Sequence, residues 1–226
     1  MVVNQLKNLN KQIISCKLCK RLVEFRERIA FEKRKQYFND EYWGKAVHGF
    51  GDKNAKILVV GLAPAAHGAN RTGRVFTGDK SSDFLFKCLY KSRLSNLQRS
   101  LNVNDSLKLE NMYITLALKC VPPNDKPTSN ELKNCYNFFK EELNLLKNVE
   151  IILALGKIAF DTCINFFGLT KSKYPFKHGQ HYVVNDKIKI LACYHPSPRN
   201  VNTGLLNEAK MNIVLDKAKS MVETTL

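Results

Sequence analysis

The sequence predicts an α/β protein, a single three-layer α/β/α domain around a central, mainly parallel four-stranded sheet. Short runs of β-branched and other apolar residues alternate with segments of helical periodicity, which is the order of β-α-β units. These apolar runs are continuous, as in strands buried on both faces. Nothing in the 226 residues resembles a linker of Gly, Ser or Pro, so one domain covering 1–226 is expected.

The expected elements follow one another in a regular order. The N-terminal part is predicted to form helices over 4–15 and 18–38, followed by an irregular segment to residue 52. The core strands are predicted at 57–62, 112–118, 151–155 and 188–193, with helices at 82–98, 129–146, 157–167 and 205–222. A short run at 182–184 is expected to pair with 188–191 across a tight turn. Right-handed crossovers then place helices on both faces of the sheet.

Two loops at the ends of strands carry the polar chemistry. The first strand ends at Gly61 and opens into GLAPAAHGANRTGRVFTGD, and the last strand runs into HPSPRNVNTG from His195. Ligands of open α/β sheets bind beyond the carboxyl ends of the strands. Both loops are therefore expected to converge on one crevice.

The charge of the chain favours a polyanionic partner, above all nucleic acid. The sequence has 36 basic and 20 acidic residues, a net charge of +16 and a pI near 9.6. Eight basic and three acidic side chains lie between residues 17 and 35. The alternative is a solvated surface charge in a lysine-rich proteome. No leader and no apolar run of roughly 20 residues is found, so an intracellular, cytoplasmic protein without membrane contact is expected.

The seven cysteines favour metal ligation or buried thiols over disulfides. Cys16 and Cys19 form a CxxC unit, while Cys120 and Cys135 lie at the two ends of a loop after the second core strand. Four thiolates that meet there would suit either zinc or an iron–sulfur cluster, and spacing does not choose between them. The remaining cysteines lie on apolar faces and are expected in the core: Cys88, Cys163 and Cys193.

The two loops together resemble the motif pair of uracil-DNA glycosylases, in particular the iron–sulfur branch called family 5 or type B. The similarity extends through YWGKAVHGFGD at 42–52 and CKLCKRLVEFRE at 16–27, so it covers most of the chain. It implies the uracil-DNA glycosylase-like fold and a monofunctional DNA glycosylase. Such an enzyme flips out uracil and other deaminated bases, including hypoxanthine and xanthine, and leaves an abasic site in base excision repair.

The resemblance also implies partners and a cofactor. Duplex and single-stranded DNA would be the substrates, and the protein is expected to act as a monomer at the nucleoid. The four cysteines of the CxxC unit and the later loop would hold a [4Fe–4S] cluster that pins the N-terminal helices to the core: Cys16, Cys19, Cys120 and Cys135.

The resemblance assigns the base pocket to both loops. Phe76 would stack on the flipped base, although it could instead be a buried loop anchor. His195 would contact the base carbonyl and stabilise the negative charge that develops as the glycosidic bond breaks. The base would also lie against the small residues and backbone amides after the first strand: Gly61, Ala63, Pro64 and Ala65.

The residue that would position the attacking water does not lie where many uracil glycosylases have it. Many uracil glycosylases have an acid or amide directly after the first strand, where this chain has Leu62 and Ala63. Asp79 of the FTGD segment is the candidate to orient water and stabilise an oxocarbenium-like sugar. Alternatively, Asp79 caps the following helix or pairs with Arg74. Further candidates with weaker support are Asn124, Asn70 and His67.

Basic and polar side chains of the loops are expected to contact DNA. HPSPRN would enter the minor groove at the lesion, with Arg199 as wedge or phosphate contact. The other predicted DNA-binding residues are Arg71, Arg74, Lys80, Ser197 and Asn200.

Three alternatives compete with a broad glycosylase. A phosphate-binding hydrolase is disfavoured because GRVFTGDKS at 73–81 departs from the phosphate-loop pattern by placing Asp79 before Lys80. An inactive iron–sulfur DNA-binding protein would explain the missing acid after the first strand. A uracil-specific family 4-like enzyme normally keeps that acid. No lysine is placed as a Schiff-base nucleophile, so no lyase step is expected.

Overall fold

The centre of the protein is one open sheet of six strands. The computed structural model describes residues 2–223. The strand order is β1-β3-β2-β4-β6-β5. The four central strands are parallel and the two edge strands are antiparallel. The strands are β1 (Phe50–Gly51), β2 (Ile57–Gly61), β3 (Met112–Leu116), β4 (Ile151–Leu155), β5 (His181–Val183) and β6 (Lys189–Cys193).

The α/β class and the four parallel strands are confirmed, and two antiparallel edge strands extend the predicted four-stranded sheet to six: β5, which is the expected partner of β6, and β1. The expected hairpin is present, since Tyr182 pairs with Ile190. Its turn is closed by the side chain of Asn185, which accepts a hydrogen bond from Ile188 N at 2.7 Å. The strand β1 was not predicted, because two residues are too short to show a period.

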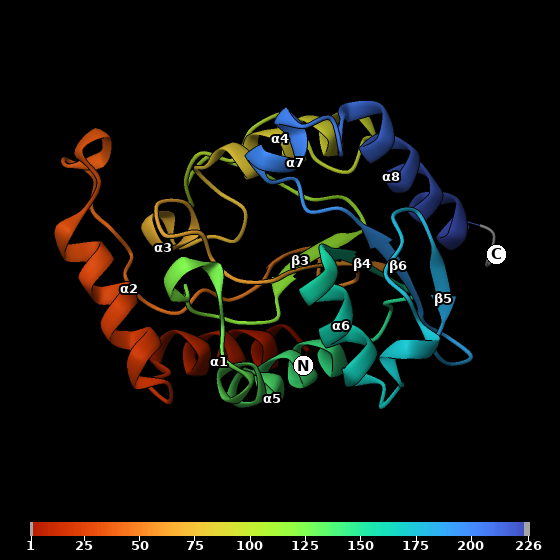
Figure 1. The fold of residues 1–226 in the computed structure, drawn as a ribbon, viewed down its shortest axis with the longest axis horizontal. Helices are drawn as coiled ribbons and strands as arrows, with labels where there is room; N and C mark the ends of the chain where they lie inside the picture. Colours follow the sequence, from red (N-terminus) through yellow and green to blue (C-terminus); the bar gives the residue numbers. More distant parts are fainter. Residues whose placement is uncertain (1, 224–226) are drawn as a thin grey trace.

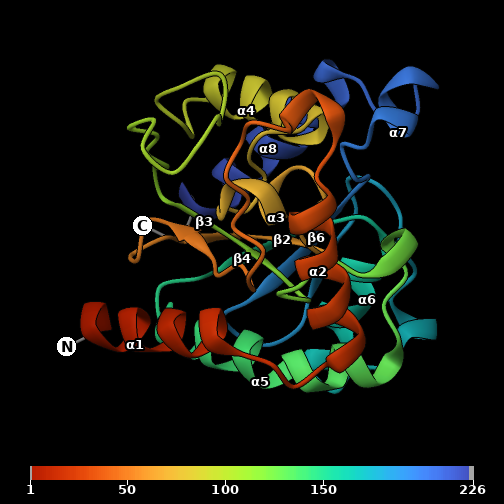
Figure 2. The same cartoon turned by 90° about the vertical axis from the view of Figure 1, so that its left-hand side faces the viewer.

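Helices cover both faces of the sheet and complete the three layers (Figures 1 and 2). α4 and α8 lie on one side, and α1, α5 and α6 lie on the other. The helices are α1 (Val2–Ser15), α2 (Lys20–Glu32), η1 (Lys35–Tyr37), α3 (Ala69–Thr72), α4 (Lys80–Lys91), η2 (Pro123–Asp125), α5 (Ser129–Leu145), α6 (Lys157–Phe166), η3 (Lys171–Lys173), α7 (Pro198–Asn202) and α8 (Glu208–Glu223). None of them, within residues 2–223, has the length and apolar character needed to cross a bilayer.

Alternation along the buried strands builds a core on each face. Val59 packs in the cluster that holds Leu85 and Leu215 from α4 and α8. Its neighbour Leu58 packs in the cluster that holds Phe160 from α6. Every residue of β2 is buried, as the continuous apolar run indicates.

Two helices end earlier than the sequence predicts. α2 stops at Glu32 because Lys33 adopts a left-handed backbone with φ 53°, which ends the hydrogen-bond ladder before residue 38. α4 stops at Lys91, and Arg93 likewise has φ 58°. Boundaries of this kind depend on backbone conformations that the apolar pattern does not encode.

A buried ion pair fastens α5 to the end of β3. Lys119 Nζ lies 2.5 Å from Glu142 Oε2 and donates to Thr115 Oγ1 at 2.6 Å. The other carboxylate oxygen of Glu142 accepts a hydrogen bond from Gly49 N at 3.2 Å. Both charged side chains are 1% exposed or less. Buried charges are tolerated only when paired and hydrogen-bonded in this way.

Replacing Lys119 with methionine should lower the free energy of unfolding by about 3–5 kcal/mol, because the Glu142 carboxylate would stay buried without its cation. Equilibrium urea unfolding measures the loss. The control is Lys157→Met, whose pair with Asp161 is exposed and should contribute under about 1 kcal/mol. Equal losses in both variants would contradict the assignment. The double variant Lys119→Met/Glu142→Leu should recover most of the stability.

Candidate active site

A cavity of about 300 Å³ opens at the carboxyl ends of β2, β3 and β6. Both predicted loops converge on it, which confirms the expected crevice. Seven predicted site residues line it, some from each loop: Ala63, Pro64, Ala65, Phe76, Asp79, His195 and Ser197. Ser81, Leu116 and Asp125 were not predicted and also line it.

Phe76 forms an aromatic wall of the cavity. Its ring centroid lies 6.0 Å from that of His195, at an interplanar angle of 34°. The ring also covers Gly61, where a Cβ would come within 2.8 Å of Phe76 Cε2. Gly61 is therefore needed for space beneath the ring, and it does not itself line the cavity. Phe76 has φ 47°, an unfavourable backbone for a bulky residue.

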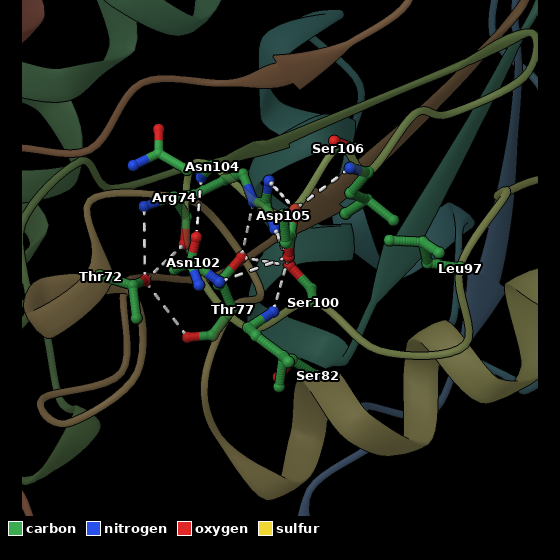
Figure 3. Close-up of polar contacts among 12 residues, drawn as sticks. Thr72, Arg74, Thr77, Ser82, Leu97, Ser100, Asn102, Asn104, Asp105 and Ser106 are labelled. Carbon is green, nitrogen blue, oxygen red and sulfur yellow. Dashed lines mark hydrogen bonds and ion pairs between the residues drawn. The ribbon is translucent and has the colours of Figure 1, made fainter.

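A buried polar network holds the backbone around Phe76 (Figure 3). Arg74 binds Asp105 through two hydrogen bonds of 2.8 and 2.6 Å and donates to Ser100 Oγ at 2.7 Å. Its Nε donates to Thr77 Oγ1 at 3.1 Å, so residues on both sides of Phe76 are fixed. Arg74 is 5% exposed, and the predicted contact with a DNA phosphate is not available to this guanidinium. The network braces the loop from inside instead.

Asp79 caps α4 and also lines the cavity. Its Oδ1 accepts a hydrogen bond from Ser82 N at 2.9 Å. Its Oδ2 points at Gly68, where a Cβ would lie only 2.0 Å away. Burial raises the pKa of this carboxyl, although the Ser82 amide and the charge of Arg71 oppose the shift. The capping and the site interpretations therefore coexist, while Arg74 pairs with Asp105 and not with Asp79.

His195 lines the same cavity. Burial lowers its pKa to about 4. Asn200 Nδ2 donates to the His195 carbonyl at 2.8 Å, which ties the last strand to α7. Among residues 2–223, no group hydrogen-bonds to the imidazole nitrogens. They are free to meet a ligand.

The remaining predicted residues divide into exposed and structural groups. Lys80 and Arg199 are exposed at the starts of α4 and α7. Ser197 caps α7, accepting from Asn200 N at 3.3 Å. Arg71, in contrast, pairs with Asp40 at 2.6 Å and donates to the Gly78 carbonyl, so it supports the loop.

The three weaker candidates do not line the cavity. Asn124 does not line the cavity, whereas its neighbour Asp125 does. Asn70 is buried and donates to the Arg26 carbonyl at 3.2 Å. His67 is bonded through Nδ1 to the Tyr42 hydroxyl at 2.9 Å. The sequence points to the loop that contains Asp125, but it does not show which of two adjacent polar side chains turns inward.

Comparisons with known proteins give the family. The model of the uracil DNA glycosylase superfamily matches residues 48–219. The chain belongs to this superfamily. A type-5 uracil-DNA glycosylase of Thermus thermophilus is 44% identical over 209 residues, 92% of this chain and 94% of the relative. Those of Mycobacterium leprae and Pyrobaculum aerophilum are 40% and 42% identical over 94% and 92% of the chain, and 94% and 89% of the relatives.

A type-4 relative is less similar. The type-4 uracil-DNA glycosylase of Archaeoglobus fulgidus is 30% identical over 155 residues, which is 67% of this chain and 70% of the relative. The type-5 relatives therefore match the chain more closely and over more of its length. Family 4-like enzymes normally keep an acid directly after the first strand, and this chain has Leu62 and Ala63 after β2, so the motif agrees with the lower similarity to the type-4 relative.

The four predicted cysteine ligands of this superfamily member line one small cavity beside α2. Three donors reach their sulfur atoms: Arg26 Nη1 to Cys120 at 2.9 Å, Asn134 to Cys19 at 3.3 Å and Lys119 N to Cys135 at 3.5 Å. Arg26 is buried and its Nε has no partner among the described residues. Within residues 2–223, no three ligating side chains lie close enough to hold a single metal ion. The cluster thus stays a prediction.

Replacing Asp105 with asparagine should lower the free energy of unfolding by about 3–5 kcal/mol, because Arg74 would stay buried without its anion. Burial would raise the pKa of Asp105, but hydrogen bonds from Arg74 and two backbone amides lower it to about 2. The pair therefore stabilises the parent above the unfolded-state pKa, and this contribution is lost as the pH falls towards 2. Urea unfolding from pH 7 to pH 2.5 should show a shallower acid loss in the variant. The same slope in parent and variant would contradict the assignment.

His195 should make stability depend on pH in a different window. Because its folded-state pKa is lowered, only the unfolded chain takes up this proton between pH 6.5 and about 4, so stability falls as the pH is lowered through that range. His195→Gln should remove this part of the dependence. Thermal unfolding between pH 7.5 and 4 tests it, and Lys80→Gln, which changes an exposed side chain, is the control and should leave the pH dependence unchanged.

Proposed function

We propose that the protein is a monofunctional DNA glycosylase that removes uracil and other deaminated bases, including hypoxanthine and xanthine, in base excision repair. One observation carries the proposal: Phe76, Asp79 and His195 face the same cavity, which lies at the ends of the parallel strands. An enzyme that acts on a flipped base needs a ring to stack on and polar groups at the base edge. The type-5 relatives are uracil-DNA glycosylases, which supports uracil as the base.

The roles follow from the positions of these side chains. The base stacks on Phe76, and a neutral His195 donates one hydrogen bond to the base oxygen as negative charge develops there. The bond between C1′ and the base nitrogen breaks with its electron pair going to the base. A water molecule, oriented by Asp79 Oδ2, adds to the cationic C1′ and loses a proton, which passes through solvent to the released base anion, so that a neutral base and an abasic site remain.

The lining of the cavity supports a broad base range. Alanines occupy positions 63 and 65, next to the predicted base plane, so no large side chain narrows the cavity there. All residues that line the cavity come from one chain, which supports action as a monomer. The proposed substrate, deaminated DNA, places the enzyme inside the cell. The competing proposal is a uracil-specific enzyme similar to the type-4 glycosylases.

DNA binding rests on charge at the mouth of the cavity. Lys80 and Arg199 are exposed beside lining residues Asp79 and Pro198. We assign Arg199 to the gap left by the flipped base, where α7 would enter the minor groove. The net charge of +16 supports the electrostatic part of this binding.

We also propose a [4Fe–4S] cluster on the four cysteines that share the cavity beside α2. The residues present suit it. Four sulfurs have three N–H donors nearby, and the buried Arg26 guanidinium, whose Nε has no partner among residues 2–223, would offset the charge of the thiolates. When bound, the cluster would supply structure and no reaction step. It would fasten the start of α2 to the end of β3 and to α5.

Asp79→Asn should lower single-turnover release of uracil by at least about 100-fold, because a carboxylate is lost while the side-chain oxygen that caps α4 is kept. The assay uses labelled duplexes with uracil, hypoxanthine or no damage, and alkali to reveal abasic sites. Asp83→Asn, on the same helix but paired with Arg99 at the surface, is the matched control.

Each outcome of this assay has a meaning. Release of both damaged bases by the parent, with strand cleavage only after alkali, supports the proposal. Release of uracil alone supports the type-4-like function. No release from cluster-loaded protein, with DNA affinity retained, supports an inactive binding protein and refutes the proposal. An Asp79→Asn variant as active as the Asp83→Asn control refutes the role of Asp79.

Replacing Cys120 with serine should lower the iron and sulfide content of anaerobically purified protein to near zero, because one of the four proposed cluster ligands is lost. The visible absorbance from sulfur-to-iron charge transfer should disappear with it. Cys163→Ser, which changes a thiol buried in the core, is the control and should keep the cluster. Zinc in place of iron in the parent would contradict the proposal.

A further inference from the structure

The end of α2 carries two large aromatic side chains in solvent. We call residues 31–38, which include the last residues of α2 and all of η1, the α2 tip. Phe31 is 87% exposed and Phe38 is 70% exposed. The tip rises from one end of the molecule in Figure 1 and lies at the upper edge in Figure 2. Two large exposed aromatic rings within one short segment indicate a binding surface more than single scattered apolar side chains do.

Positive charge separates the two rings. Lys33, Arg34 and Lys35 lie between them, against one acid, Glu32, which pairs with Arg28 at 4.0 Å. Among the described residues, none of these three cations forms an ion pair. Lys33 Nζ lies 6.0 Å from the centre of the Phe38 ring. Aromatic rings interleaved with unpaired cations suit single-stranded nucleic acid, in which bases stack and phosphates need counterions.

The α2 tip is fixed to the loop that builds the cavity. The Arg71 guanidinium lies 3.9 Å from the centre of the Tyr37 ring and pairs with Asp40. A second connection runs from Arg34 N to the Tyr42 hydroxyl at 3.4 Å and from there to His67. Arg71 and His67 belong to the loop that carries the lining residues Ala65 and Asp79. The tip therefore has a set position relative to the cavity.

The tip and α7 lie along the same edge of the molecule. Both views place the α2 tip and α7, which carries Arg199, at the upper edge (Figures 1 and 2). Because Ser197 and Pro198 at the start of α7 line the cavity, the nucleotides beside a base held there would leave the cavity at this edge. In a duplex the faces of each base are covered by the neighbouring base pairs, so exposed rings stack most readily on unpaired bases.

We propose that the α2 tip binds the single-stranded DNA that flanks the target nucleotide. Phe31 and Phe38 stack on unpaired bases, and Lys33, Arg34 and Lys35 contact the phosphates between them. The surface gives the enzyme affinity for damage in unpaired strands beyond what the base cavity supplies. This inference rests on the proposed function only in taking DNA as the substrate.

The first test is the double variant Phe31→Ala/Phe38→Ala. Its affinity for an undamaged single-stranded oligonucleotide, measured by fluorescence anisotropy, should fall by at least about 5- to 100-fold, which is the loss expected from even one of the two base–aromatic stacks. Affinity for a blunt duplex of the same length should change less than about twofold. Val183→Ala/Ile213→Ala, which truncates two exposed apolar side chains of β5 and α8, should change neither.

The second test removes the charge of the α2 tip. Lys33→Gln/Arg34→Gln/Lys35→Gln should reduce the slope of log affinity against log salt by about two on single strands. Unchanged single-strand affinity in the aromatic variant, with thermal stability intact, overturns the inference and points to a protein partner. Equal losses on both kinds of DNA overturn it too. If the parent binds DNA but releases no base, the anisotropy result still decides this inference independently of the proposed function.

Discussion

The cavity depends on the ion pair between Arg74 and Asp105. Phe76 can form the aromatic wall only with a left-handed backbone, which is unfavourable for its bulky side chain. Arg74 and Thr77 flank it, and both are bonded to a second loop through Ser100 and Asp105. Because the pair is buried, little water competes for it, and the strained conformation is held by charge-assisted hydrogen bonds. The proposed stacking surface of Phe76 is thus positioned by residues that do not line the cavity.

Asp79 shows how one carboxylate can serve both the fold and the site. One oxygen satisfies a free amide at the start of α4, and the other remains on the cavity side against Gly68. A helix start also favours negative charge. Burial opposes that charge and raises the pKa of Asp79, so the two effects compete at this residue. Such a balance suits a group that assists a cationic transition state and still anchors a helix.

The N-terminal region connects the cysteine cavity with the cavity for the base. Arg26 donates to Cys120 Sγ through its side chain and accepts from Asn70 through its carbonyl. Asn70 lies in α3, next to the lining residue Ala69. The helix α2 therefore contacts both places and carries the α2 tip at its far end. A cluster that orders the start of α2 would also order the base-pocket loop and the tip.

The sequence by itself determined the α/β class, the parallel core strands and the convergence of two loops, because apolar runs, alternation and motifs are local signals. It also identified most residues that line the cavity, through the resemblance to a family. Only the tertiary structure decided which of these side chains turn inward. Arg74 is buried and not on the DNA-binding surface as predicted, because Asp105, 31 residues further along the chain, pairs with its guanidinium in the interior. Asp125, and not the predicted Asn124, lines the cavity. The tertiary structure alone showed the edge strand β1 and the residues at which α2 and α4 end. Partners distant in sequence set these outcomes, and no local pattern encodes them.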